Sequence, residues 1–149
     1  MAVRVVSLLA LVFTALALVP YGAHLFALPN KIGMTEAQYF IAQSIYRGWA
    51  LLAVVVFPAL LIDVIFVVML RKRGVAFYLA AGGSLCMAAA LVIFFVFTSP
   101  ANVATENWTV SPANWEALRS QWEYSHAANA VLNFIAFCLV ALASVVPRH

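Results

Sequence analysis

The sequence between residues 48 and 97 reads GWALLAVVVFPALLIDVIFVVML (Gly48–Leu70), RKRG (Arg71–Gly74) and, one residue later, AFYLAAGGSLCMAAALVIFFVF (Ala76–Phe97). Each apolar run has the length of about 20 residues that a helix needs to cross the hydrocarbon core of a bilayer. A short break with three cations is excluded from hydrocarbon, so the chain turns back there outside the bilayer. The two runs are therefore predicted to form a pair of transmembrane helices.

Two further apolar runs, Val5–Ala27 and Tyr124–Val146, have the same character. The 149 residues are 66% hydrophobic and only 9% charged, whereas a soluble domain carries roughly 25% charged residues. The first run resembles a signal peptide around Ala15-Leu16-Ala17, but it continues through Leu28 and is expected to be retained. The predicted fold is all-α: residues 1–149 form a single four-helix transmembrane domain, with lipid as its main solvent.

The basic residues predict the orientation. Arg4, the Arg71–Arg73 cluster and Arg148 fall on one side, which is cytoplasmic by the positive-inside rule. Both termini are then cytoplasmic, and two long loops face out. An integral membrane protein of a bacterial inner (plasma) membrane is expected, with its site on the non-cytoplasmic side. Basic tracts with interleaved aromatic residues are absent, so nucleic acid is not an expected partner.

Several residues within the spans are expected to serve packing. Cys86 and Cys138 lie in apolar runs and are interpreted as small packing residues, with a redox pair as the alternative. The small residues Ala80, Ser84 and Ala88 recur at four-residue spacing, which lets helices approach closely. Asp63 is a carboxylate without an evident partner at its depth, and a protonated or helix-bonded side chain is expected there.

A polar stripe in the fourth helix is the most specific local signal. At 100° per residue, an arc of about 80° contains Trp115, Arg119, Trp122, His126, Asn129 and Asn133, with Glu123 at its edge. Amide and ionisable groups are unfavourable against lipid, so this stripe is expected to face the bundle interior or a wet cleft. The helix is expected to begin near Asn114 or Trp115. The competing interpretation is that these groups only anchor the outer loops.

The other helices bring polar and aromatic groups to the same outer end. These are Tyr21 and His24 in the first helix, Tyr39, Gln43, Tyr46, Arg47 and Trp49 at the start of the second, and Asn102 after the third. Convergence of this kind predicts a binding site in a membrane bundle. His24 is expected to lie near His126, with Arg47 and Arg119 close by.

These residue types allow two kinds of chemistry. His126 beside Glu123 could act as a base, and Arg47 or Arg119 could stabilise an oxyanion on a phenol, enol or quinone. Alternatively, His24 and His126 could ligate haem, or join Glu123 in a metal site, although one Glu-x-x-His spacing is a weak signal. Trp49, Trp108, Trp115 and Trp122 could form flat walls for an aromatic ligand or an interfacial belt.

The segments Pro100-Ala-Asn102, Asn107-Trp108-Thr109 and Trp115-Glu-Ala-Leu118-Arg119-Ser-Gln-Trp122-Glu123-Tyr-Ser-His126 resemble a family of small four-helix membrane proteins that includes the fungal anthrone oxygenases. The resemblance implies the four-helix fold and oxidation of an anthrone to an anthraquinone by dioxygen. It implies that Asn102, Arg119, Trp122 and His126 line the site. Glu123, Tyr46 and His24 lie outside the fungal pattern.

Two functions therefore stay open. The first is a membrane oxidoreductase or oxygenase-like enzyme acting on a lipophilic aromatic or quinone-like molecule. The second is a non-catalytic haem-, metal- or lipophile-binding protein, or a subunit of an oligomer or larger complex. Unpaired Gly and Pro breaks and the lack of an inverted repeat disfavour a transporter. Expected catalytic residues are His126, Glu123, Arg119 and Arg47; expected substrate-binding residues are His24, Tyr46, Trp49, Asn102, Trp108, Trp115, Trp122 and Asn129; candidate metal ligands are His24, Glu123 and His126.

Overall fold

The computed structural model describes residues 1–147, so Arg148 and His149, the first of which entered the orientation argument, lie outside the described residues. The chain is all-α and 84% helical, and four of its helical segments are long and apolar enough to cross a membrane. The predicted four-helix architecture is confirmed at this level. Which membrane it occupies, and which end faces the cytoplasm, stay predictions.

The helices follow one another along the chain as α1 (Ala2–Lys31), α2 (Glu36–Gln43), the 3₁₀ turns η1 (Ser44–Tyr46) and η2 (Trp49–Leu52), α3 (Ala53–Leu70), α4 (Val75–Ile93), the π-helical segment η3 (Phe94–Thr98), α5 (Ser99–Ala104) and α6 (Trp115–Val145). The first helix continues beyond the apolar run that ends at Ala27, to Lys31, and the third long segment continues beyond Phe97, to Ala104. The last helix begins at Trp115, as expected from the polar stripe. Polar residues at these ends extend the helices beyond the apolar runs.

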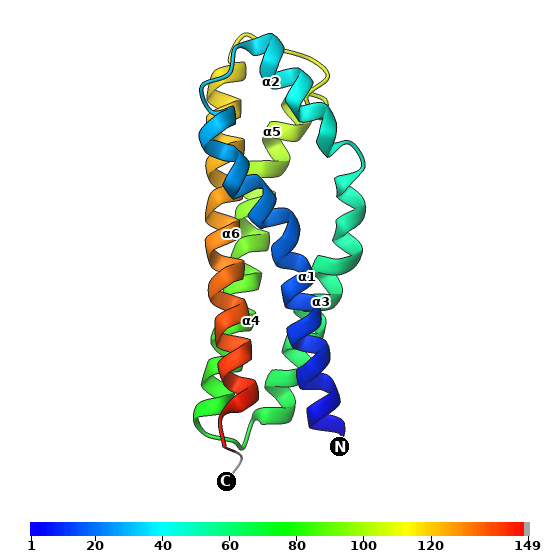
Figure 1. The fold of residues 1–149 in the computed structure, drawn as a ribbon, viewed down its shortest axis with the longest axis vertical. Helices are drawn as coiled ribbons and strands as arrows, with labels where there is room; N and C mark the ends of the chain where they lie inside the picture. Colours follow the sequence, from blue (N-terminus) through cyan, green and yellow to red (C-terminus); the bar gives the residue numbers. More distant parts are fainter. Residues whose placement is uncertain (148–149) are drawn as a thin grey trace.

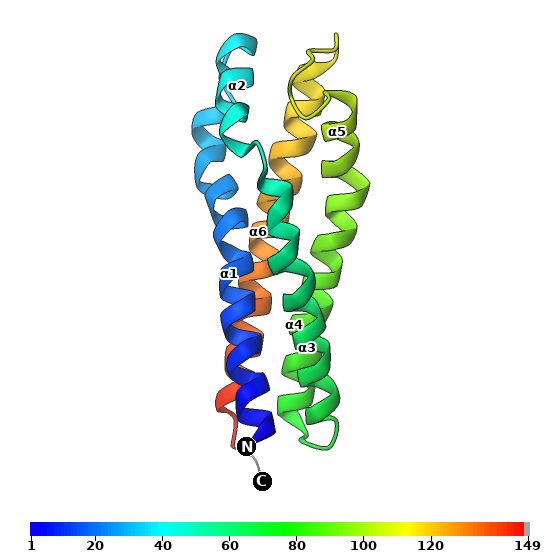
Figure 2. The ribbon, with the colours of Figure 1, turned by 90° about the vertical axis from the view of Figure 1, so that its right-hand side faces the viewer.

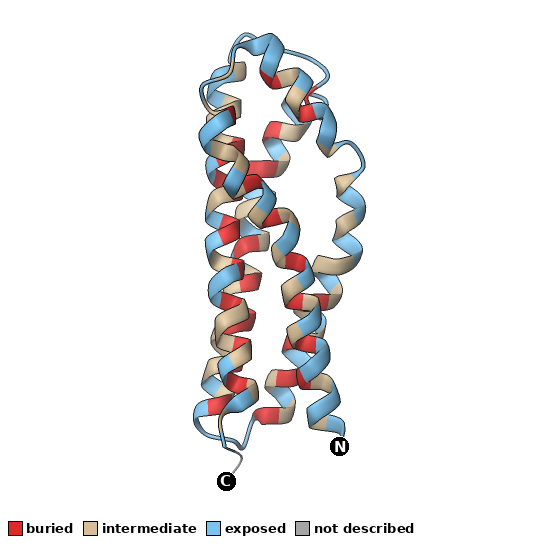
Figure 3. Ribbon diagram, viewed as in Figure 1, coloured by how far each residue is buried: buried red, intermediate tan, exposed pale blue. Residues whose placement is uncertain are grey.

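The four long segments lie side by side and alternate in direction, with both ends of the described chain at one end of the bundle (Figures 1 and 2). Helix α1 packs against α3 and α6, and α4 packs against the same two helices. Buried residues face inward along each helix, and the surface of the apolar spans is largely exposed (Figure 3). Exposed apolar side chains over most of the length are what a lipid-facing bundle requires.

Two apolar clusters fill the half of the bundle that holds the termini. The lower one centres on Ala10, Phe66, Leu70, Ala80 and Val140, with Ala76 and Ala143. The next, toward the middle, contains Ala17, Ala59, Met87 and Ala136. A Cβ on Gly83 would lie only 2.9 Å from Cγ2 of Val140 and 3.2 Å from the backbone oxygen of Ala136. The small residues of α4 therefore let it approach α6 closely, as their spacing predicts.

The other end of the bundle is covered by α2 and η1, which form a cap over α1 and α6 (Figure 1). Thr35 starts α2 with a capping box to Gln38. The chain then turns at Gly48, whose φ of 87° is a left-handed conformation that favours glycine. Tyr39 and Gln43 were expected at the start of the second span, but this turn sets them on a separate short helix.

Candidate functional site

A pair of stacked histidines lies between α1 and α6 in the capped half of the bundle. The ring centroids of His24 and His126 are 4.0 Å apart, and their planes differ by 26°. Three aromatic rings surround His24, with centroid distances of 4.4 Å to Tyr46, 4.9 Å to Trp122 and 5.4 Å to Trp49. The structure thus brings together five of the predicted site residues.

Both histidines are buried, yet the Nδ1 atom of each has no hydrogen-bond partner. A buried polar atom without a partner is destabilising by about 1–3 kcal/mol. Such atoms are rare in folded proteins, and they are explained by an internal water, a ligand or a chemical role. The pair therefore offers two open ring nitrogens inside an aromatic enclosure.

A buried ion pair lies next to the histidines. Lys31 Nζ is 2.6 Å from Glu123 Oε1, and the two side chains are 5% and 0% exposed. The same carboxylate oxygen accepts a 2.9 Å hydrogen bond from the Tyr39 hydroxyl, which in turn accepts one from the Gln43 amide. Gln43 Oε1 also accepts a long hydrogen bond from Lys31. This network joins the last turn of α1, the cap helix α2 and α6.

Glu123 was considered as the neighbour of a His126 base, but the structure gives its carboxylate other partners. One carboxylate oxygen of Glu123 is occupied by Lys31 and Tyr39, while the other has no partner. His126 Nδ1 is likewise unpartnered, so the described structure has no Glu123–His126 hydrogen bond. The three-residue spacing puts both side chains on one helical face, but Lys31 reaches the carboxylate first.

Aromatic rings surround the lysine ammonium. Lys31 Nζ lies 4.5 Å from the ring centroid of Tyr46, 4.7 Å from that of Trp122 and 5.3 Å from that of Tyr39. Contacts of this kind stabilise a partly desolvated cation. Burial raises the pKa of Tyr39 and that of Tyr46, and the neighbouring Glu123 carboxylate raises both further. Both phenols therefore remain protonated at neutral pH, and Tyr39 serves as a donor to Glu123.

Asn102 holds two of the predicted tryptophans in place. Its Oδ1 accepts hydrogen bonds of 2.8 Å from Trp122 Nε1 and 3.3 Å from Trp108 Nε1. Trp108 is the last of three consecutive residues with positive φ, after Glu106 and Asn107. The centroid of its ring lies 5.0 Å from that of Tyr39, edge to face. Asn102 therefore holds the Trp122 ring, which contacts the histidines, and does not contact the histidines itself.

The two predicted arginines have different positions. Arg119 donates a 2.6 Å hydrogen bond to the backbone oxygen of Met34 and lies 4.6 Å from the ring centroid of Trp115. This hydrogen bond links the α1–α2 connection to α6, about two helical turns from His126 toward the start of α6. Arg47 is exposed, and among residues 1–147 its side chain has no hydrogen bond or ion pair. Its expected place at the site stays a prediction.

The polar stripe of α6 continues below the histidines into the bundle. Asn129 and Asn133 are fully buried. Neither amide atom of Asn129 has a partner, and Oδ1 of Asn133 has none either, although Asn133 Nδ2 donates to the backbone oxygen of Asn129. The interior placement predicted from the 100° periodicity is confirmed for this face.

The residues do not match the metal sites considered above. Among residues 1–147, no group of three or more His, Cys, Asp and Glu side chains is arranged to hold a metal ion. Two imidazoles that ligate one haem iron from opposite sides point their nitrogens at each other. His24 and His126 instead lie face to face. Cys86 and Cys138 are free and half-buried, in keeping with the packing role expected for them.

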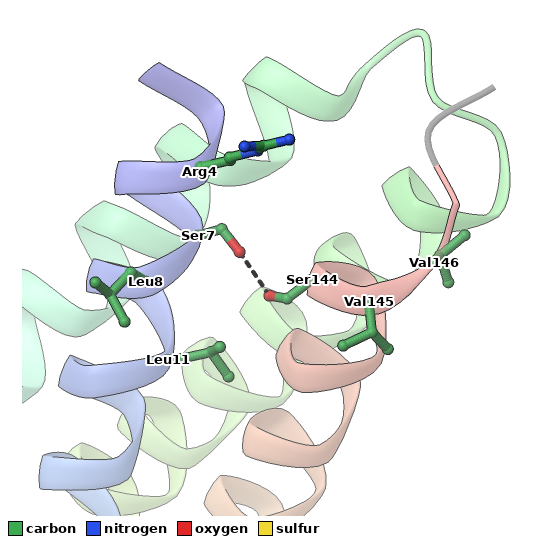
Figure 4. Close-up of a pocket in the computed structure, with 7 residues that line it drawn as sticks. All are labelled: Arg4, Ser7, Leu8, Leu11, Ser144, Val145 and Val146. Carbon is green, nitrogen blue, oxygen red and sulfur yellow. Dashed lines mark hydrogen bonds between the residues drawn. The ribbon is translucent and has the colours of Figure 1, made fainter. Parts of the chain in front are cut away.

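Two depressions lie outside this cluster. An apolar groove lies on the surface between the end of α4 with η3 and the first half of α6, lined by Ile93, Phe97, Ser120, Gln121, Tyr124, Ser125 and Ala128. Behind it, the hydroxyls of Thr98 and Ser125 are hydrogen-bonded at 2.7 Å. A cleft of about 580 Å³ lies at the opposite end of the bundle, where Ser7 bonds Ser144 below Arg4 (Figure 4). Neither depression was expected from the sequence.

Lys31 was not among the site residues expected from the sequence, and Tyr39 was expected only as one of the polar and aromatic groups at this end of the bundle. Glu123 could have indicated the lysine, because an ionised glutamate on an interior helix face needs a buried cation as its partner. Asp63 was expected to lack a partner at its depth, and this is also wrong. Thr14 Oγ1 on α1 lies 3.2 Å from Asp63 Oδ2. Contacts between neighbouring helices cannot be obtained from the periodicity of one helix.

Comparison with known proteins identifies no relative: no family model, curated protein or solved structure matches this chain.

Proposed function

We propose that this chain is a membrane protein that binds a lipophilic aromatic molecule, of the anthrone, phenol or quinone class, at the His24–His126 pair and acts on it as an oxidoreductase or oxygenase-like enzyme. One observation carries the proposal. Two buried imidazoles with unpartnered Nδ1 atoms lie within an enclosure of Tyr46, Trp49 and Trp122. Flat apolar walls with a few polar groups are the usual composition of a small-molecule site.

The residues suit proton abstraction from a carbon next to a carbonyl. A neutral imidazole is a general base near neutral pH. His126 would remove a methylene proton from an anthrone, leaving an enolate. Lys31 would stabilise the oxyanion, since its ammonium contacts two rings of the enclosure, Tyr46 and Trp122. In the overall oxidation, one atom of dioxygen becomes the new carbonyl oxygen and the other leaves as water with the two methylene hydrogens.

The likeness to the family of the fungal anthrone oxygenases supports this substrate class at Asn102, Arg119, Trp122 and His126. In the structure, these four residues are neighbours. Asn102 accepts a hydrogen bond from Trp122, and the ring centroids of Trp122 and His126 are 4.2 Å apart. Arg119 lies one helical turn before Trp122 on α6. Tyr46 and Trp49 are half-buried, whereas Trp122 is buried, so these two rings form the more exposed part of the enclosure.

A second candidate is a non-catalytic lipophile-binding protein. It is favoured by the ion pair of Lys31 and Glu123. Because each charge is compensated by the other, neither group is free to stabilise a charge that develops on a substrate. A binding protein would hold the same molecule between the same rings without turnover. Oxygen consumption separates the two candidates.

The test uses purified protein in lipid nanodiscs with anthrone and a short-chain naphthoquinone as probes. Binding is measured by quenching of tryptophan fluorescence, and turnover by oxygen consumption with anthrone. We expect His126→Ala to weaken binding or turnover about tenfold or more, since a base contributes about 10²–10⁴-fold to rate. Ser144→Ala, at the far end of the bundle, is the control and should behave like the unmodified chain.

The proposal fails if the unmodified protein neither binds nor oxidises either probe. It also fails if His126→Ala lowers the unfolding temperature but leaves binding unchanged, because His126 would then be a structural group. His24→Ala provides a second variant should His126→Ala not fold.

We further propose that the Arg71–Gly74 turn is cytoplasmic and that the histidine pair lies in the non-cytoplasmic half. The basic residues of this turn support the orientation. Lys72→Cys and Ser111→Cys, made in a chain whose two native cysteines are replaced by alanine, report on it. A membrane-impermeant maleimide applied to intact cells should label Ser111→Cys alone. Labelling of Lys72→Cys from outside would reverse the orientation.

A further inference from the structure

Asp63 is a buried acid that the proposed chemistry does not use. It is 1% exposed and lies in the middle of α3, within the lipid-embedded part of the bundle. The ion pair found in residues 1–147 joins Lys31 to Glu123 and leaves Asp63 without a cation. An ionised carboxylate without a cation is strongly disfavoured in such surroundings.

The hydrogen bonds of Thr14 indicate the protonation state of Asp63. Thr14 Oγ1 lies 2.7 Å from the backbone oxygen of Ala10 and 3.2 Å from Asp63 Oδ2. A threonine hydroxyl has a single hydrogen, and the shorter bond to Ala10 uses it. The contacts from the Thr14 hydroxyl to Asp63 are long, 3.2 Å to Oδ2 and 3.4 Å to Oδ1, so they compensate little of a carboxylate charge. Without a cation or a short hydrogen bond, the neutral acid is the favoured form of Asp63.

The register between helices places Ser84 at the same depth. Ser7 bonds Ser144 and His24 stacks on His126, so α1 and α6 run antiparallel in a constant register between these contacts. Thr14 then lies opposite residues 136–137 of α6. Gly83 packs against Ala136 and Val140, which sets Ser84 opposite the same turn. Hydroxyls from α1 and α4 thus share one level with the Asp63 carboxyl from α3.

Unpartnered polar atoms lie between this level and the histidines. Ser84 Oγ, Asn133 Oδ1, both amide atoms of Asn129 and Nδ1 of His126 are buried without a partner. Asn133, Asn129 and His126 follow one another at intervals of four and three residues on the interior face of α6. Each interval rises about 5 Å along the axis, a gap that one water molecule bridges between two polar groups.

Toward the end of the bundle that holds the termini, the level of Asp63 is closed. The apolar cluster around Ala10, Phe66 and Val140 separates it from the Ser7–Ser144 pair and the cleft of Figure 4. On the histidine side, the cluster of Ala17, Ala59, Met87 and Ala136 is also apolar, but Asn133 and Asn129 continue the interior face of α6 past it. Among residues 1–147, the buried polar atoms without a partner lie at the level of Asp63 or on the side of the histidines.

We infer that Asp63 is a proton-binding site that exchanges its proton with the His24–His126 pair along Ser84, Asn133, Asn129 and the water molecules between them. The path is a half-channel, open to the histidines and closed on the side of the termini. It can supply or take up protons at the histidine pair without letting protons cross the membrane. The inference does not depend on which molecule the histidines bind.

The test follows deuterium exchange at Asp63 by infrared spectroscopy of the full chain in lipid nanodiscs, with no ligand added. The carbonyl band of a protonated carboxylic acid shifts on deuteration, and Asp63→Asn identifies the band by removing it. We expect Asn129→Leu and Asn133→Leu to slow the exchange about tenfold or more, because each removes a hydrogen-bonding step. Asn133→Ala, which leaves room for water, should exchange at nearly the original rate.

Two controls fix the direction of the path. Phe134→Leu changes a lipid-facing residue at the depth of Asn133 and should have no effect. Ser7→Ala with Ser144→Ala should also leave the rate unchanged; slowing by these two substitutions would mean entry from the other end and would overturn the inference. Absence of an Asp63 acid band, or exchange unaffected by both Asn→Leu changes, would overturn it as well. If a leucine variant does not fold, the valine variant at that position replaces it.

Discussion

Removing either partner of the Lys31–Glu123 ion pair tests the energetic account of the capped half most directly. In Lys31→Met, Glu123 keeps the hydrogen bond from Tyr39 but loses the cation 2.6 Å away, at a site with no solvent exposure. Removal of one partner of a buried pair costs about 3–5 kcal/mol, because the remaining charge is left uncompensated. We expect a loss in this range for Lys31→Met.

The reverse substitution should be milder. In Glu123→Gln, Lys31 still has Gln43 Oε1 and the faces of Tyr46 and Trp122 as neighbours. Cation–π contacts contribute about 0.5–2 kcal/mol, so Glu123→Gln should lose about 1–2 kcal/mol less than Lys31→Met. The double variant should recover to within about 1–2 kcal/mol of the unmodified chain, because it leaves no buried charge.

The assay is equilibrium unfolding in mixed micelles of a mild detergent and dodecyl sulfate, followed by circular dichroism. Lys72→Met, at an exposed lysine, is the control and should change the unfolding free energy by less than about 0.5 kcal/mol. The reasoning is refuted if Lys31→Met is as stable as this control. It is also refuted if the double variant loses the sum of the two single losses, because independent sites add and paired charges do not.

Three other predictions concern the surrounding structure. Because burial and its carboxylate partner raise the pKa of Tyr39, its contribution is complete below the ordinary tyrosine pKa of about 10 and is lost as pH rises above it. Tyr39→Phe should therefore be less stable at neutral pH and show a shallower alkaline decline in unfolding free energy; an unchanged decline contradicts this. Gly83→Ala should destabilise by about 1–3 kcal/mol through its contacts with α6, whereas Gly22→Ala, with nothing within 4 Å, should be neutral or stabilising. Asn102→Leu should lower the unfolding temperature and red-shift tryptophan emission, since it leaves the indole of Trp122 without its 2.8 Å acceptor; an unchanged spectrum counts against that role.

The sequence predicts the features that depend on a single helix. The apolar runs predict four spans, and the 100° periodicity of α6 predicts that Asn129 and Asn133 face inward. The closeness of His24 and His126 also follows, because each lies near the same end of its span. These predictions need only helical geometry and the cost of polar groups in lipid.

Features that depend on the packing of side chains from different elements were not predictable in this way. Lys31 reaches Glu123 because α1 continues for four residues beyond its apolar run and the flexible side chain bends inward. Arg47 is exposed and follows the 3₁₀ turn η1 instead of lying on one continuous helix with Tyr39 and Gln43. Neither helical phase nor composition contains this information, since both outcomes are set by the tertiary contacts of the cap.

The depth of each polar residue separates loop anchoring from a functional site. Anchoring accounts for the outermost layer: Arg119 binds the backbone of the α1–α2 connection, and Asn102 fixes Trp108 after its turn. It does not account for Asn129 or Asn133, which lie below the histidines on α6, where their side-chain hydrogen bond is to the helix itself. Apolar residues of similar volume would pack there without unpartnered atoms. The polar interior of α6 is therefore better explained by water, protons or a ligand than by the need to hold the cap in place.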